Sequence, residues 1–103
     1  MSKFEITLSQ VYERYKECNS LETSMLMGMR NGQASAEGWS RYRDCQRFFG
    51  NAKKSYKAAL NILQVMENNP KYADKKYLPR LIKEGDEALQ IAKGYSMLGL
   101  LKA

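Results

Sequence analysis

Apolar residues recur every three or four positions along most of this chain, which is the spacing of an amphipathic helix. No proline occurs from residue 35 to residue 68. We therefore predict one helix over 35–68, about 50 Å long at 1.5 Å per residue. Ser35 is the expected N-cap, and Asn69-Pro70 ends the helix because proline cannot continue it. The apolar stripe of this helix consists of Trp39, Tyr42, Cys45, Phe49, Ala52, Tyr56, Ala59, Leu60 and Leu63.

A second stripe with the same spacing lies upstream and predicts a helix over about 3–29, with Thr7 or Ser9 as the cap if the helix starts later. If the chain reverses at Asn31-Gly32, the two stripes face each other in an antiparallel hairpin. Facing residue numbers then add to 63 or 64 throughout, so that Cys18 lies opposite Cys45. Asn and Gly tolerate the left-handed backbone that ends helices and makes turns. The upstream stripe consists of Phe4, Leu8, Val11, Tyr15, Cys18, Leu21 and Met25.

A third, shorter helix is predicted over about 79–100, because Pro79 suits the first position of a helix. The connector before it is polar and basic, with room for a short extra turn over 73–77. The predicted fold is all-α: a long antiparallel hairpin with a third helix packed against it, forming a three-helix bundle. At 103 residues the chain is expected to be a single domain, 1–103.

The composition limits which compartments and which partners are to be expected. The chain is 27% charged and 44% hydrophobic, as in ordinary globular proteins. No apolar run approaches the roughly 20 residues that span a bilayer, so we expect no membrane partner. The opening residues, MSKFEITLSQ, lack the apolar core of a signal peptide, which makes a cytoplasmic location the expectation. The net charge of +6 is compatible with an acidic partner but does not require one.

The sequence offers no chemistry for an enzyme. It contains no histidine, so neither a cysteine–histidine pair nor a zinc site can be built from its two cysteines. No glycine-rich phosphate loop is present. We expect no catalytic residue, no metal and no cofactor. Cys18 and Cys45 fall on the predicted hairpin interface, where they form either two buried thiols or a disulfide; a reducing cytoplasm favours the thiols.

The first functional hypothesis is a non-enzymatic protein-binding module, such as an adaptor, a small chaperone or an inhibitor, with a second copy of the chain as one candidate partner. Methionine and aromatic residues exceed what the helix interfaces need, and methionine suits adaptable contact surfaces. Trp39 either caps the end of the core or stands at the hairpin tip as a binding anchor. The candidate partner-binding residues are Trp39, Met27, Met29 and Phe48.

The alternative hypothesis is nucleic-acid binding through two basic groups. The first lies on one face of the helix over 35–68, and the second lies in the connector and the start of the third helix, interleaved with Tyr72 and Tyr77. Basic residues beside aromatic rings suit single strands, because they contact phosphates and stack on bases. The candidate nucleic-acid-binding residues are Arg43, Arg47, Lys54, Lys75, Lys76 and Arg80.

Overall fold

The computed structural model describes residues 7–69, 71 and 74–103, and for residues 74 and 75 the backbone only. The described chain is a helical rod with extents of 52 × 19 × 18 Å. Its elements are α1 (Leu8–Asn31), α2 (Ala36–Asn68), the 3₁₀ helix η1 (Asp74–Tyr77), α3 (Leu78–Lys93) and α4 (Met97–Leu101).

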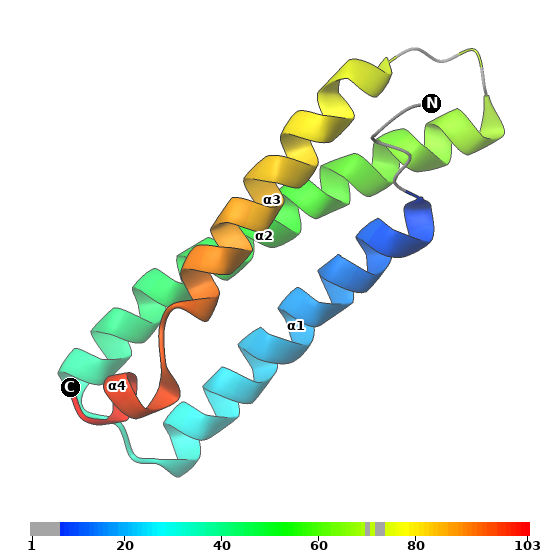
Figure 1. Cartoon of the computed structure of the whole chain (residues 1–103). Helices are drawn as coiled ribbons and strands as arrows, with labels where there is room; N and C mark the ends of the chain where they lie inside the picture. The colour runs from blue at the N-terminus through cyan, green and yellow to red at the C-terminus, as the bar shows by residue number, and fades with distance from the viewer. Residues whose placement is uncertain (1–6, 70, 72–73) are drawn as a thin grey trace.

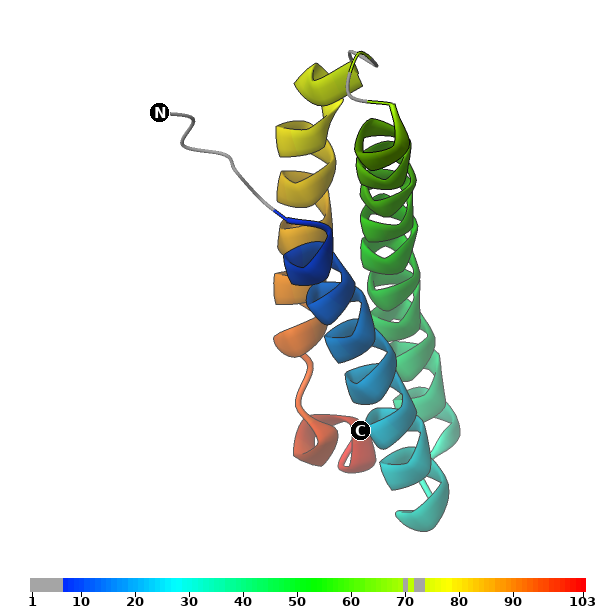
Figure 2. The same ribbon diagram turned by 90° about the vertical axis from the view of Figure 1, so that its right-hand side faces the viewer.

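The three long helices form the predicted all-α bundle. α1 and α2 make the antiparallel hairpin, and α3 runs back along α2 (Figure 1). In Figure 2, α1 lies on the viewer's side, over the junction between α2 and α3. The helix predicted over 35–68 and the short extra turn before the third helix are both confirmed.

The first helix begins at Leu8, so the later of the two predicted starts, with Thr7 as the cap, is confirmed. Thr7 is the N-cap of α1: its hydroxyl accepts a hydrogen bond from the Gln10 backbone N–H at 3.2 Å, and the Gln10 side chain accepts one from the Thr7 N–H at 3.0 Å. This reciprocal pair is a capping box, which starts a helix at the next residue. The expected helical residues 3–6, with the Phe4–Ala59 pair, lie outside the described residues.

The third helix is interrupted, and the prediction of one helix over 79–100 is wrong. α3 ends at Lys93, and Gly94 is its C-cap. Ser96 then begins a new helix, because its hydroxyl accepts a hydrogen bond from the Gly99 backbone N–H at 3.0 Å. The last five helical residues, α4, therefore turn away from α3 and pack at the hairpin tip.

The hairpin turns where predicted but with a different backbone. Gln33, not Asn31 or Gly32, takes the left-handed conformation, with φ of 50°. The register is also displaced by about one helical turn: the Cys18 thiol faces the Phe49 carbonyl oxygen at 3.9 Å, and the Cys45 sulfur lies 4.0 Å from that of Met25. A one-turn displacement keeps the same stripes facing, because each stripe repeats every turn.

A glycine of α3 lets that helix pack closely against α2. A Cβ atom on Gly85 would lie 2.6 Å from Cε1 of Tyr56, so the Tyr56 ring occupies the space that a side chain would need. The Tyr56 hydroxyl donates a hydrogen bond to Asp86 at 2.5 Å. Asp86 also pairs with Arg14 of α1 at 3.3 Å. This set of contacts joins all three long helices at one level of the rod.

The hairpin tip is closed by α4. A Cβ atom on Gly38 would meet the carbonyl oxygen of Leu100, so the α4 backbone rests directly on the start of α2. Leu100 is buried against Met29 and Tyr42. The Ser35 hydroxyl donates a hydrogen bond to the Ala103 carbonyl at 2.6 Å, which anchors the end of α4.

Two glycine substitutions test the packing between α2 and α3. Gly85→Ala places a methyl group against the Tyr56 ring, and overpacking of this kind destabilises by about 1–3 kcal/mol. Gly50 has nothing within 4 Å of its Cβ position, so Gly50→Ala is the matched control and stabilises α2 by about 0.5–1 kcal/mol. Denaturant unfolding followed by circular dichroism measures both, and equal effects at the two sites would contradict this account.

Candidate functional site

The strongest candidate for a binding site is a groove between α2 and α3, with a volume of about 550 Å³. We call it the α2–α3 groove. α1 packs elsewhere, since its ion pairs to α2 and α3 use a different set of side chains. The apolar residues that line the groove are Phe48, Ala58, Leu81, Ala88 and Ile91, and the polar ones are Asn51, Lys54, Ser55, Glu84 and Glu87.

The groove has an apolar floor and walls of opposite charge. Ile91 is 49% exposed although it is aliphatic. Lys54 stands on the α2 wall, while Glu84 and Glu87 stand on the α3 wall. An open apolar channel bounded by charges is what an amphipathic helix of a partner recognises.

The four residues predicted to bind a protein partner fall in different environments. Phe48 lines the groove, where its ring lies 6.5 Å from that of Tyr95. Met27 is 55% exposed on α1. Met29 is fully buried in the tip cluster, so its assignment to a contact surface is wrong. Its face of α1 is covered by α4, which the sequence placed at the end of a continuous third helix.

Trp39 occupies an intermediate position. Its ring packs edge-on against Tyr42 at 5.7 Å and 88°. It is partly buried beside the cluster that also contains Leu100. Of the two roles considered for Trp39, these contacts favour a cap on the tip of the core. Tyr42 beneath it is 2% exposed, and burial raises the pKa of its hydroxyl.

The first predicted basic group is brought together on the outer face of α2. Arg43, Arg47 and Lys54 are all exposed, and none of them forms an ion pair within the described part of the chain. The Arg47 guanidinium lies 5.5 Å from the centre of the Phe48 ring. By contrast, Arg41 on the same helix pairs with Glu37 at 3.0 Å.

The second basic group lies at the opposite end of the rod and is only partly available. Lys76 is exposed, with its ammonium 5.3 Å from the centre of the Tyr77 ring. Arg80 pairs with Glu84 at 3.1 Å. The side chain of Lys75 lies outside the described residues. The fold therefore does not join the two predicted basic groups into one surface.

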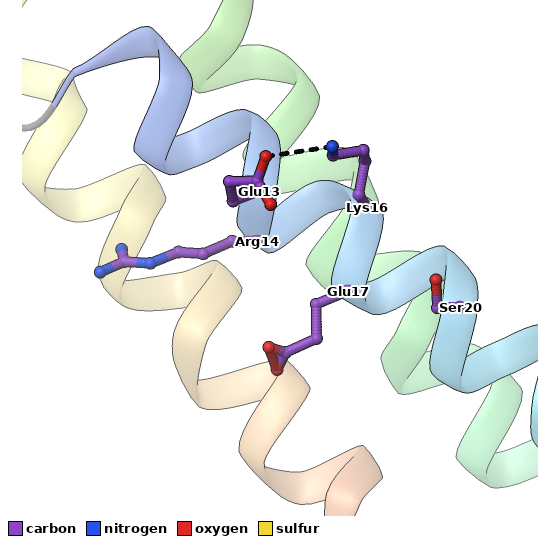
Figure 3. A pocket seen from close by; sticks show the side chains of 5 residues that line it. All are labelled: Glu13, Arg14, Lys16, Glu17 and Ser20. Carbon is purple, nitrogen blue, oxygen red and sulfur yellow. Dashed lines mark ion pairs between the residues drawn. The ribbon is translucent and has the colours of Figure 1, made fainter.

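A second hollow, of about 440 Å³, lies on α1 (Figure 3). It is lined by polar and charged residues only: Glu13, Arg14, Lys16, Glu17 and Ser20. All four charged groups already have partners, since Glu13 pairs with Lys16, Arg14 with Asp86 and Glu17 with Lys93. Arg14 and Glu17 extend toward α3 in the picture. We assign this hollow a structural role in joining α1 to α3.

The two cysteines are free and buried. Burial raises the pKa of the Cys18 thiol and of the Cys45 thiol to about 11. The Cys45 thiol donates to the Ala92 carbonyl at 3.5 Å. No group of three or more Cys, Asp or Glu residues in the described chain is placed to hold a metal ion.

Sequence reasoning missed the α3 side of the groove. None of Leu81, Ala88 and Ile91 is among the candidate binding residues predicted from the sequence. These residues form a stripe of their own, with Glu84 between them, beside the buried stripe of α3. Two adjacent apolar stripes on one helix are the signal that could have found the groove. The buried stripe consists of Leu78, Ile82, Gly85, Leu89 and Ala92.

Within the described residues, none of the helices combines the length and apolarity required to cross a bilayer. Comparison with protein families, with curated proteins and with solved structures found no match.

The thiols provide a test of the core. At pH 8 a thiol with a pKa near 9 is about a hundredfold richer in thiolate than one with a pKa near 11, and thiolate is the reactive form. Ellman's reagent is therefore expected to label the folded protein at least about a hundredfold more slowly than the urea-unfolded protein. Rapid labelling of both cysteines under native conditions would contradict the burial described for them.

Proposed function

We propose that the chain is a non-enzymatic protein-binding module that receives a helical segment in the α2–α3 groove. The observation that carries this proposal is the partly exposed apolar floor of the groove, with Ile91 its exposed member, on a fold whose other described hollow is lined with paired charges. A segment with a narrow apolar stripe would cover Phe48 and Ile91 while its flanks remain at the charged walls. The best-packed anchors of such interfaces carry most of the binding energy.

A cytoplasmic location is part of the same proposal. What supports it is the pair of free, buried cysteines. Unpaired thiols persist in reducing compartments, where disulfides are rare.

The groove is tested with Ile91→Asp, which places a charge on the apolar floor. The tagged protein is used to capture partners from a nuclease-treated lysate, and Ile91→Asp is expected to reduce capture about tenfold or more. Val65→Asp is the matched control, because Val65 is 41% exposed on α2 and does not line the groove. Equal capture by Ile91→Asp and the wild type, with both folded by circular dichroism, would remove the groove as the binding site.

A second candidate function is nucleic-acid binding, which the unpaired basic face of α2 favours. Arg43, Arg47 and Lys54 are spaced along one exposed face, so they can follow a phosphate backbone. Their freedom from ion pairs in the described chain leaves their charge available to displace counterions.

Salt dependence separates this candidate from the first. If the basic face binds a labelled single strand, the double variant Arg43→Gln/Arg47→Gln lowers the steepness of log K against log salt by about 1.4, or about 0.7 for each lost phosphate contact. Lys16→Gln/Lys83→Gln removes the same charge from helices other than α2 and is the control. Absence of binding by the wild type at low salt would eliminate nucleic acid as a partner.

A further inference from the structure

We propose that the α2–α3 groove is closed by a second copy of this chain, in a symmetric dimer in which α2 of each copy packs against α3 of the other. This inference rests on the proposed function, because it names the partner of the same groove. Two observations support the dimer: the signs of the charges on the two groove walls, and the positions of these charges along the axis of the rod.

The contacts between α2 and α3 establish which residues lie level. Tyr56 packs on Gly85, and the Phe48 ring lies beside that of Tyr95. α2 and α3 are antiparallel, so Lys54 lies level with Glu87 across the groove. The basic wall and the acidic wall therefore carry their charges at the same height.

Two symmetric arrangements can place this face on itself, because a two-fold axis in the interface runs either across the helices or along them. An axis across the helices stacks α2 on α2 and brings Lys54 toward its own copy. An axis along the helices stacks α2 on α3 of the second copy, antiparallel and at the same height. Lys54 then faces Glu84 and Glu87 of the second copy, and two such sets form by symmetry. Like charges at an interface are strongly unfavourable, so the wall charges select the second arrangement.

The two carboxylates are available for this contact. Glu84 pairs with Arg80 and Glu87 with Lys83, the latter at 4.0 Å. These glutamate side chains are 50% and 63% exposed, and such solvated pairs are weak. Arg80 and Lys83 do not line the groove, so the carboxylates are the α3 charges nearest to an incoming α2.

The arrangement also buries the apolar floor. By the same register, Leu81 of one copy would lie near Ala58 of the other, and Ile91 would lie near Phe48 and Asn51. α1 lies over the α2–α3 junction (Figure 2), and the side chains with which it forms ion pairs, Lys53, Asp86 and Lys93, do not line the groove, so it does not obstruct this face. The dimer would then have a central layer of four helices, with one α1 on each outer side.

The test is a set of charge reversals on the full chain, with the molar mass measured by light scattering across a concentration series. The wild type is expected to dimerise. Lys54→Glu alone, and Glu84→Lys/Glu87→Lys alone, are each expected to raise the dissociation constant about tenfold or more. The variant carrying all three changes restores opposite charges in the proposed arrangement and is expected to recover dimerisation. If α2 faced α2, Lys54→Glu would only exchange one like-charged pair for another, so the single reversals would not weaken dimerisation and the triple variant would restore nothing.

Lys57→Glu is the matched control, since Lys57 is an exposed lysine of α2 that does not line the groove, and it is expected to dimerise like the wild type. A wild type that stays monomeric at all concentrations, or a triple variant that fails to recover, overturns the inference. The lysate experiment with Ile91→Asp distinguishes this failure from failure of the proposed function. If the monomeric chain captures a different protein and Ile91→Asp abolishes that capture, the groove remains a protein-binding site with another occupant.

Discussion

The three-helix arrangement depends on one aromatic ring and the missing side chain opposite it. Tyr56 is fully buried at the middle of α2, and Gly85 allows α3 to approach its face. Leaving the hydroxyl at the far end of the ring without a partner would cost about 1–3 kcal/mol. Asp86 accepts its hydrogen bond and, with its other oxygen, binds Arg14 of α1. Tyr56 thereby sets the distance between α2 and α3, and Asp86 links α3 to α1.

The ion pairs connect the same three helices. Ion pairs join α1 to both of its neighbours: Lys53 to Glu22 on the α2 side, and Lys93 to Glu17 on the α3 side. The Lys53–Glu22 pair is the less exposed of the two, with side chains 28% and 18% exposed. The charges between the helices are therefore used in holding the bundle together. Arg43, Arg47 and Lys54, on the outer face of α2, take no part in the ion pairs of the described chain.

The elements that local chemistry determines could be predicted from the sequence. The long helix over 35–68 needs only its periodicity, the cap at Ser35 and the proline after it, and it is found as expected. The register could not be predicted as well. A stripe that repeats every turn faces its partner equally well after a displacement of one turn, so the pattern alone does not distinguish Cys45 from Phe49 as the neighbour of Cys18.

The remaining differences between the predicted and the observed structure depend on how the helices pack against one another. Helical periodicity continues across Gly94, so the break before α4 is invisible until the tip of the hairpin is available to receive it. The groove was missed for a related reason. α3 carries two neighbouring apolar stripes, and only the position of α1 decides that the stripe with Ile91 stays uncovered. Which residues can bind a partner is therefore settled by packing, whereas which residues form helices is settled locally.

The narrowness of the rod has a consequence for how the molecule tolerates change. With a cross-section of 19 × 18 Å, there is room for one column of core side chains and no inner layer behind it. Each level along the axis is held by the few side chains that meet there. A defect at one level therefore loosens its immediate neighbours, while levels several turns away keep their own contacts. The tip, where α4 packs, and the middle, where Tyr56 packs on Gly85, are therefore expected to respond independently to substitutions.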